Sequence, residues 1–272
     1  TWFDQTIAAT GRISSSEPNL QNIPVRTPMG REIRRAFIAK DGCVLVDADY
    51  SQIELRLLAH LSGDEAMCEA FTLGQDIHAR TAAEVYGVPI EEVTPQMRSS
   101  AKAVNFGIVY GISAFGLANN LHIPPKEAAD FIARYFARYP AIHKFMDACV
   151  SQGKAEGYSV TMYGRRRPLP ELSSPNYNRR QFGERAAMNT PVQGAAADII
   201  KIAMNAVHDE LAKERLSARL ILQVHDELIV ETPVEEQEKV TALLRRCMEG
   251  AARLRVPLVA DVHAGHSWYD TK

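Results

Sequence analysis

The sequence predicts an α+β fold, in which an antiparallel sheet carries a mostly helical insertion. Apolar strand patterns occur near residue 45 and again between 219 and 231, so strands lie towards both ends of the chain. Helical patterns dominate the stretch from about 60 to 180. Strands at both ends and helices in the middle indicate a sheet domain interrupted by a helical segment.

The length, net charge and cysteine content of the chain limit the possible classes of protein. The chain has 272 residues, is 46% hydrophobic and carries a formal net charge of −2. It is long enough for a substantial core, and any nucleic-acid partner must be bound by local clusters of charge. No apolar run approaches the ~18 residues of a membrane helix, so we expect no membrane contact. The four cysteines are far apart and show no CxxC spacing, which favours a reducing, cytoplasmic setting.

The elements follow in order along the first half. Prolines at 18, 24 and 28 disfavour long helices near the N-terminus. Val44–Val46 has the pattern of a buried strand. Helical patterns then occur at about 52–61, 64–86, 95–110, 126–138 and 140–156.

The second half begins with "SVTMYGRRRPLPEL", which predicts a turn or hairpin with a basic tip, and "YNRRQFGERAAMN", which predicts a basic helix. Thr190 and Pro191 resemble an N-cap and the first residue of a new helix, which we expect to reach about Lys213. The remaining pattern predicts strands at 219–224 and 228–231, a helix at about 234–252, and a strand within 256–265.

Two carboxylates stand at the ends of predicted strands. Asp49 follows the apolar run at 44–46, and Asp226 lies much further along the chain, at the tip of "LILQVHDELIV". Side by side, two carboxylates repel each other unless a cation lies between them. Oxygen ligands of this kind suit Mg²⁺, and two such ions ~3.5–4 Å apart can assist phosphoryl chemistry. Taken singly, each aspartate is equally compatible with an ordinary solvated turn.

The segment "TPQMRSSAKAVNFGIVYG" predicts a helix with two cations and two aromatics on one side. Arg98, Lys102, Phe106 and Tyr110 recur every four residues, which places them within about 120° of one face. Cations at one end and aromatic rings at the other suit a nucleotide, with phosphates on the cations and a base on a ring. The alternative is a mixed surface helix with a partly buried end.

Five stretches of the sequence resemble one family. "DYSQIELR" (Asp49–Arg56), "RSSAKAVNFGIVYG" (Arg98–Gly111) and "QVHDELIV" (Gln223–Val230) look like motifs A, B and C of the family A DNA polymerases. "ATGRISSSEPNLQNIPVRTP" (Ala9–Pro28) and "NTPVQGAAADIIK" (Asn189–Lys201) match that family too. The matches come in the family's order and span essentially the whole chain.

The resemblance implies a right-hand polymerase fold: a palm at 1–60 and 181–272 and a mostly helical fingers insertion at 61–180. Family members carry a helical thumb and an exonuclease-like domain ahead of the palm. Because Arg12 stands so close to the start of the sequence, we expect palm and fingers without a thumb in this chain.

It also implies a metal site. Asp49 and Asp226 resemble the catalytic aspartates, which would bind two Mg²⁺ ions with help from the Tyr50 backbone carbonyl. Glu227 would support this catalytic site, and Lys102 would give a proton to the leaving pyrophosphate.

The implied substrate contacts form two sets. Phe106 would stack on the incoming base, Tyr110 would occupy the template-base position, and Glu54 would exclude a ribose 2′-hydroxyl. The nucleotide-binding set is His78, Arg98, Lys102, Phe106, Tyr110, Glu54 and Gln52. The DNA-binding set is Arg12, Arg26, Arg185, Asn189, Gln193 and His225.

The expected activity is templated nucleotidyl transfer by a monomer that binds primer–template DNA and dNTPs in the cytoplasm, associated with the nucleoid. A single-subunit, phage-type RNA polymerase is one alternative, against which Glu54 argues. A catalytically silent nucleic-acid-binding module is the other, against which intact Asp49, Asp226, Arg98 and Lys102 argue.

Overall fold

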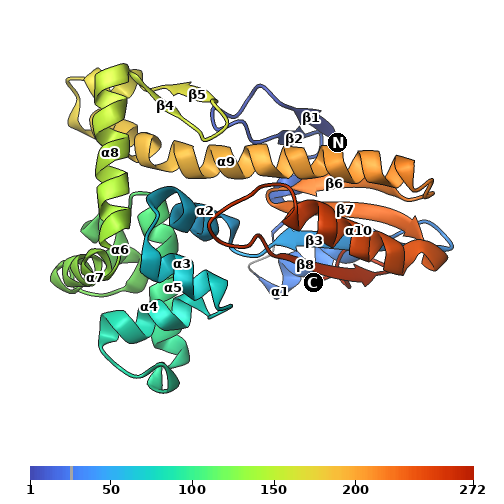
Figure 1. Cartoon of the computed structure of the whole chain (residues 1–272), viewed down its shortest axis with the longest axis horizontal. Helices are drawn as coiled ribbons and strands as arrows, with labels where there is room; N and C mark the ends of the chain where they lie inside the picture. Colours follow the sequence, from blue (N-terminus) through green and yellow to red (C-terminus); the bar gives the residue numbers. More distant parts are fainter. Residues whose placement is uncertain (25–26) are drawn as a thin grey trace. The chain divides into compact units, whose positions relative to one another are not determined.

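The computed structural model describes residues 1–24 and 27–272, so the prediction for Arg26 lies outside the described residues. The chain forms two compact units (Figure 1). Unit 1 comprises Thr1–Ile53, Ala196–Arg253 and Leu258–Lys272, and unit 2 comprises Glu54–Ala195 and Leu254–Pro257. The mixed α+β class is confirmed, because unit 1 contains a sheet and unit 2 is mostly helical.

Unit 1 is built on a four-stranded antiparallel sheet with the order β6-β7-β3-β8. The strand expected at 44–46 is longer than predicted and includes both acids that follow it. In the register of the sheet, Asp49 of β3 lies opposite Glu227 on one side and Asp261 on the other. The strands are β3 (Cys43–Tyr50), β6 (Arg219–Val224), β7 (Glu227–Pro233) and β8 (Ala260–Gly265).

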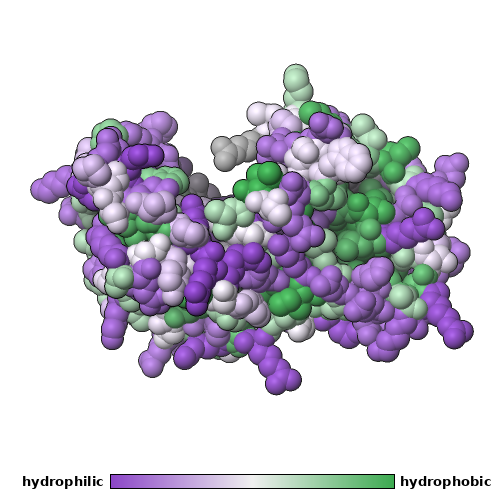
Figure 2. Space-filling model, turned by 90° about the horizontal axis from the view of Figure 1, so that it is seen from above, coloured by the Kyte–Doolittle hydropathy of each residue, from purple (hydrophilic) through white to green (hydrophobic). Residues whose placement is uncertain are grey.

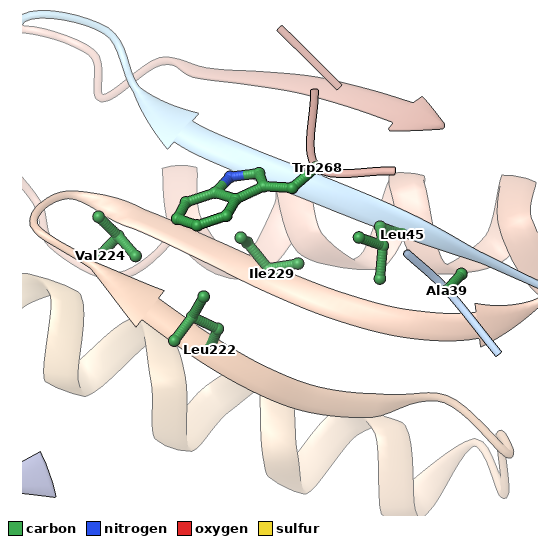
Figure 3. Close-up of a cluster of buried hydrophobic side chains, with 6 residues drawn as sticks. All are labelled: Ala39, Leu45, Leu222, Val224, Ile229 and Trp268. Carbon is green, nitrogen blue, oxygen red and sulfur yellow. The ribbon is translucent and has the colours of Figure 1, made fainter. Parts of the chain in front are cut away.

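One face of this sheet carries a compact apolar cluster, in which the Trp268 indole lies among aliphatic side chains of the strands (Figure 3). The cluster contains Ala39, Leu45, Leu222, Val224, Ile229 and Trp268. Side chains alternate across a strand, so Val46, Ala48 and Tyr50 point to the other face. There α10 (Gln237–Glu249) packs on β3, and the Tyr50 hydroxyl donates to the Met248 carbonyl at 2.6 Å.

The N-terminal part of unit 1 consists of short pieces, as the prolines predict. These are β1 (Trp2–Asp4) paired with β2 (Ser14–Ser16), α1 (Pro28–Glu32), and the 3₁₀ turns η1 (Leu20–Asn22) and η2 (Ile33–Ala36). A further 3₁₀ turn, η5 (Val234–Glu236), precedes α10.

In unit 2, the single helix predicted over 64–86 is wrong, because two helices occupy that range. The first ends before Gly74, whose φ of +64° breaks the helix, and Asp76 then caps the second by accepting from the His78 and Ala79 N–H groups. The helices are α2 (Ile53–Ser62), α3 (Glu65–Thr72), α4 (Ile77–Tyr86), α5 (Pro95–Val109), α6 (Ala114–Leu121), α7 (Pro125–Arg138) and α8 (Pro140–Glu156). Short turns at η3 (Ile90–Glu92) and η4 (Pro170–Ser173) complete the unit, with a hairpin of β4 (Tyr158–Val160) and β5 (Arg166–Pro168) that confirms the predicted turn.

The helix α9 (Tyr177–Lys213) is continuous, so the predicted N-cap at Thr190 is wrong. Pro191 has no N–H to donate to the Ala187 carbonyl one turn earlier. The Ser159 hydroxyl donates to that carbonyl at 3.3 Å, and the Thr190 hydroxyl donates to the Ala186 carbonyl at 2.6 Å. A residue from the β4–β5 hairpin thus replaces the missing backbone bond, and the helix continues through the proline.

The surface contains both hydrophilic and hydrophobic side chains. In the face drawn in Figure 2, hydrophilic side chains prevail and hydrophobic ones lie scattered among them. The most exposed large apolar side chains include Trp2, Ile7, Met29 and Phe115. Among the residues that the structure describes, no helix combines the length and the apolar character that crossing a membrane requires.

Candidate active-site residues

A cluster of carboxylates gathers on one face of β3 in unit 1. Asp47 and Asp49 are separated by a single residue of the strand and therefore point to the same face, and Glu227 of β7 lies directly opposite Asp49. The Lys272 ammonium lies among all three. Its Nζ atom is 3.0 Å from Asp47 Oδ2, 3.2 Å from Glu227 Oε2 and 3.6 Å from Asp49 Oδ2.

The β6–β7 turn brings the second predicted aspartate to this strand. The Tyr50 N–H donates to the Asp226 carbonyl at 3.1 Å, so Asp226 lies beside the residue that follows Asp49. His225 adopts a φ of +52°, a left-handed conformation that costs a non-glycine residue energy. The Gln223 side chain donates to the His225 carbonyl and holds the turn in this shape. The backbone of Asp226 therefore lies at the same end of β3 as Asp49, although the two residues are far apart in sequence.

Burial and mutual repulsion govern the charge of the cluster. Burial raises the pKa of Asp49, with a further upward contribution from Glu227 that Lys272 opposes. Burial and then Glu227 raise the pKa of Asp47 to about 8, again against the effect of Lys272. Each carboxylate would lose its proton more readily beside another cation. The cluster therefore has the electrostatics of a cation-binding site.

The donor set fits a divalent metal ion such as Mg²⁺. All side-chain donors are carboxylate oxygens, the ligand type that Mg²⁺ prefers, and the Asp49 side chain keeps 48% of its surface exposed. Asp47 Oδ1 is buried and has no hydrogen-bond partner among the described residues. Within those residues no three metal-binding side chains surround one point, so an ion would take further ligands from water or phosphate.

Three members of the cluster were missed by sequence reasoning. Asp47 could have been found from its alternate-residue spacing to Asp49. Lys272 lies at the far end of the sequence, and no local pattern marks it. Trp268 donates its indole N–H to Glu227 Oε1 at 2.6 Å, which fixes that carboxylate within the cluster.

The predicted nucleotide helix is α5 of unit 2, and its predicted span is confirmed to within one residue. Thr94 caps it, accepting from the Met97 N–H at 3.2 Å, and Pro95 occupies the first turn. Arg98 donates from Nε to Asp76 Oδ2 at 2.6 Å, and Lys102 is exposed one turn later. Both cations therefore lie at the N-terminal end of the helix, accessible to an anion.

His78 of α4 lies against this helix and is only 3% exposed. Its ring centroid is 5.7 Å from that of Phe106, and its Nδ1 atom is 3.0 Å from Asn105 Nδ2. Burial lowers the pKa of His78 to about 4, helped by Arg98 and Lys102 and opposed by Asp76. At neutral pH this histidine is uncharged.

The C-terminal end of α5 contacts the predicted sugar-recognition residue. Tyr110 donates its hydroxyl to Glu54 Oε2 at 2.7 Å, and the Glu54 side chain is buried. Beside Tyr110 is a cavity of about 490 Å³, lined by Phe106, Gly111 and Arg185 among others. Gly111 has a φ of +64°, and a Cβ there would lie 2.6 Å from Met188, so the wall requires glycine.

The remaining predicted residues are divided between the units. Arg185, Asn189 and Gln193 lie on successive turns of α9 in unit 2, and Asn189 Oδ1 is buried without a partner in the described part of the chain. Arg12 is half-buried and His225 exposed, both in unit 1.

Gln52, also in unit 1, has a φ of +55°. Its side-chain Oε1 is buried and, within residues 1–24 and 27–272, accepts no hydrogen bond. Like Asn189, it therefore holds a polar atom whose bonding capacity is unused.

Comparison with known proteins places the chain in a family. The model of DNA polymerase family A matches residues 1–270. All of the chain aligns with DNA polymerase I of Geobacillus stearothermophilus at 56% identity over 273 residues, and with DNA polymerase I of Caldicellulosiruptor bescii at 53% over 272 residues. The aligned regions make up 31% and 32% of those relatives, so the chain spans about a third of their length.

A solved structure agrees with this result. The POL domain of Pol1 from M. smegmatis, in a complex with DNA primer-template and dNTP, superposes with a TM-score of 0.95 at 48% sequence identity. The match covers 99% of this chain and 48% of that one. The chain belongs to the family A DNA polymerases.

Proposed function

We propose that this chain carries out DNA-templated DNA synthesis, adding deoxynucleotides to a primer 3′-hydroxyl with release of pyrophosphate. The observation that carries the proposal is the placement of Asp226 at the end of β3 where Asp49 stands. The cation-bearing helix α5 supports it from unit 2. The POL domain that superposes on this chain was solved with primer-template and dNTP, the substrates that we assign here.

The two units would divide the reaction between them. The sheet of unit 1 corresponds to a palm, expected at 1–60 and 181–272, and the helices of unit 2 to fingers, expected at 61–180. Unit 1 would supply the metal-binding carboxylates, and unit 2 would supply the groups that bind the nucleotide.

In unit 1, Asp49, Asp226 and the Tyr50 carbonyl would hold two Mg²⁺ ions. Bound there, the ions would favour ionisation of the primer 3′-hydroxyl and neutralise the triphosphate. Glu227 is fixed by Trp268 and Lys272 and would support the site without binding an ion itself. The carboxylates would hold the site in place, since phosphoryl transfer depends on positioning and charge stabilisation.

In unit 2, Arg98, Lys102 and His78 would contact the triphosphate. Arg98 would exchange Asp76 for a phosphate oxygen, keeping one charge-assisted bond throughout. As the primer oxygen forms its bond to the α-phosphorus and the bond to the β-phosphate oxygen breaks, Lys102 would donate a proton to the departing pyrophosphate. The primer hydroxyl would release its proton to solvent water, and Lys102 would regain one from solvent, so the protons balance.

Selection of the substrate would depend on the far end of α5. Phe106 would stack on the incoming base, and Tyr110 would hold Glu54 beneath the sugar through their 2.7 Å hydrogen bond. A ribose 2′-hydroxyl would then meet a buried carboxylate that is already engaged. Gln52 would contact the nucleotide, and the primer–template would be contacted by Arg12, Arg26, Arg185, Asn189, Gln193 and His225.

Primer extension by this chain, first with dNTPs and then with NTPs, tests the proposal. We expect templated extension with dNTPs only, and none from an Asp226→Asn variant. Equal use of both nucleotides would favour an RNA polymerase. Binding of primer–template without extension by the wild type would favour a silent binding module. In Glu54→Ala we expect NTP incorporation to rise, whereas unchanged discrimination would remove Glu54 from sugar selection.

A further inference from the structure

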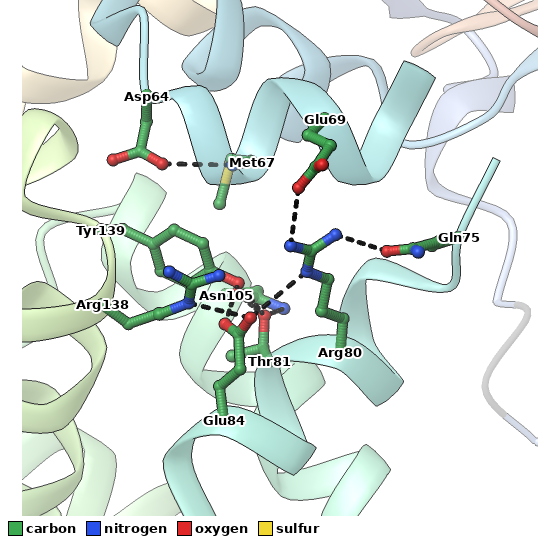
Figure 4. A network of polar contacts seen from close by, with 10 residues as sticks. All are labelled: Asp64, Met67, Glu69, Gln75, Arg80, Thr81, Glu84, Asn105, Arg138 and Tyr139. Carbon is green, nitrogen blue, oxygen red and sulfur yellow. Dashed lines mark hydrogen bonds and ion pairs between the residues drawn. The ribbon is translucent and has the colours of Figure 1, made fainter. Parts of the chain in front are cut away.

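A chain of polar contacts runs through unit 2 from a carboxylate to the histidine of the nucleotide site. It begins at Glu84 of α4, whose Oε1 is 3.2 Å from Arg80 Nε and 2.8 Å from Arg138 Nε (Figure 4). A guanidinium group only donates hydrogen bonds, so Glu84 Oε1 accepts from both arginines. Glu84 Oε2 accepts as well, and Glu84 is therefore the acceptor at which the bonds that follow begin.

Each hydrogen bond in this series then determines which group donates and which accepts in the next. Tyr139 donates its hydroxyl to Glu84 Oε2 at 3.0 Å, and burial raises its pKa, so it keeps that proton. The Tyr139 oxygen is then left as an acceptor for Thr81 Oγ1, which lies 3.4 Å away. Thr81 has one proton. Given to Tyr139, this proton continues the relay and leaves the Thr81 oxygen to accept from Asn105, whereas given to Asn105 Oδ1, at 3.3 Å, it would separate Asn105 from Glu84.

Asn105 is the next member and is fully buried. Its Nδ2 atom donates to Thr81 Oγ1 at 3.2 Å and lies 3.0 Å from His78 Nδ1. An amide nitrogen has two protons and no lone pair to offer, so His78 Nδ1 accepts. In a neutral imidazole with Nδ1 as acceptor, the proton sits on Nε2.

We propose that Asn105 is a positioning residue that fixes His78 as the tautomer with its proton on Nε2, through a relay that starts at Glu84. The tautomer is a property of the free protein. Its use, the donation of the Nε2–H to a triphosphate oxygen, rests on the proposed function.

The chemistry of the site explains why the tautomer matters. Arg98 and Lys102 already supply two positive charges for the triphosphate, and the lowered pKa of His78 leaves it neutral beside them. A neutral imidazole helps an anion only if it presents N–H rather than a lone pair. With the opposite tautomer, a lone pair would face phosphate oxygens and repel them. A single amide therefore decides whether His78 attracts or repels the nucleotide.

The test measures the tautomer directly. In chain labelled with ¹⁵N-histidine, long-range ¹H–¹⁵N spectra at neutral pH distinguish a protonated from an unprotonated Nδ1, and the His78 signals are those missing from His78→Gln. We expect Nε2–H for His78 in the wild type. A His78 that carries its proton on Nδ1, or on both nitrogens at neutral pH, would overturn the proposal without any further variant.

Asn105→Asp reverses the expected tautomer with little change of shape. A carboxylate there accepts only, so His78 should move its proton to Nδ1, and the Kd for dNTP should rise roughly 10-fold or more. Asn119→Asp, on the exposed part of α6, adds the same charge to the same unit and should change neither quantity. If Asn105→Asp left the tautomer unchanged, Asn105 would not be the positioning residue.

Two further results separate this inference from the proposed function. Tyr139→Phe removes the link to Glu84 while leaving Asn105 in place, and we expect a mixture of both tautomers. A pure Nε2–H tautomer in that variant would overturn the relay from Glu84. If Asn105→Asp switched the tautomer but left the dNTP Kd unchanged, the relay would stand and the assigned nucleotide contact of His78 would fail.

Discussion

The two units differ in how their charged side chains are balanced. In unit 1, three carboxylates share one ammonium, Lys272, so a surplus of negative charge remains on one face of the sheet. In unit 2, Arg80 and Arg138 match the carboxylates of Glu69 and Glu84. Asp76 is paired with Arg98. A surplus of one sign marks a site for a mobile ion of the opposite sign, whereas balanced pairs mark parts whose geometry is fixed. The comparison supports the proposals of metal binding in unit 1 and of preset hydrogen-bond geometry in unit 2.

The largest expected effect comes from removing a carboxylate of unit 1. Asp49→Asn or Asp226→Asn should reduce extension on the order of 10³-fold or more, because a bound metal supplies several kcal/mol to the transition state. Affinity for primer–template should change little. In EDTA, Asp49→Asn should raise the thermal midpoint, since it removes one of the repelling charges.

Asp209→Asn is the matched control, because Asp209 is an exposed aspartate of α9 in unit 1 and its substitution removes the same charge outside the cluster. It should retain extension. Near wild-type turnover with Mg²⁺ in either Asp49→Asn or Asp226→Asn would remove that residue from the metal site.

The next effect probes the cations of unit 2. Arg98→Ala or Lys102→Ala should each lower kcat/KM for dNTP by roughly 10- to 150-fold, since each removes a charge-assisted contact to phosphate. Primer–template affinity should remain close to that of the wild type, and Lys144→Ala, an exposed lysine of α8, should be neutral. Equal losses in nucleotide use and DNA affinity would contradict the assignment of these cations to the nucleotide.

Much of the fold could be predicted, because the decisive signals are local. Apolar alternation located the strands, and the Thr94–Pro95 pair located the start of α5. The break at Gly74 and the continuity of α9 were missed for different reasons. Gly74 interrupts an otherwise helical pattern, and helical patterns tolerate single glycines. The proline in α9 is compensated by Ser159, which lies too far from Pro191 in sequence for any local window to contain both.

In the candidate site too, residues marked by a local pattern could be predicted, and residues that only the fold brings together could not. Asp49 and Asp226 could be paired because each ends an apolar strand, and the family motifs supplied the cations. Lys272 reaches the cluster from the last position of the sequence, and nothing around it marks this role. Asn105 lies inside a recognised motif, yet its role depends on Tyr139 and Glu84, which only the fold brings together.

The pH dependence of stability should differ in sign between the units. His78 has a folded pKa of about 4, below its ordinary value of 6.5, so the unfolded chain binds more protons between these values. The contribution of His78 to stability should therefore fall as the pH drops from 6.5 towards 4, by no more than about 3 kcal/mol. Asp47 has a folded pKa of about 8, above its ordinary 3.8, so the folded chain binds more protons and stability should fall as the pH rises towards 8.

Urea unfolding in EDTA between pH 4 and 8 measures both contributions. Below pH 6.5 they act in opposite directions, and above it only that of Asp47 remains. Asp47→Asn should abolish the loss of stability above pH 6.5 and leave a rise between pH 4 and 6.5, whereas His78→Gln should leave a steady fall from pH 4 to 8. If neither substitution changed the profile, or both changed it in the same direction, the assignment of one contribution to each unit would be wrong.

The smallest effect concerns the one cation of the carboxylate cluster. Lys272→Met keeps the length of the side chain and removes its charge, so in EDTA Asp47 and Glu227 lose their counter-ion. The side chain is 35% exposed, and solvent screens part of the interaction, so the loss of stability should be on the order of 1 kcal/mol. Added Mg²⁺ should recover this stability, because the ion no longer shares Asp49 with an ammonium, and its apparent affinity should rise several-fold. The matched control is Lys213→Met. Lys213 is an exposed lysine of α9 paired with Glu210, and its substitution removes the same charge from unit 1 outside the carboxylate cluster.

Thermal midpoints in EDTA and along a Mg²⁺ titration compare the two variants. Identical behaviour of both would mean that Lys272 does not balance the charge of unit 1, and the contrast between the units would then depend on the carboxylates alone.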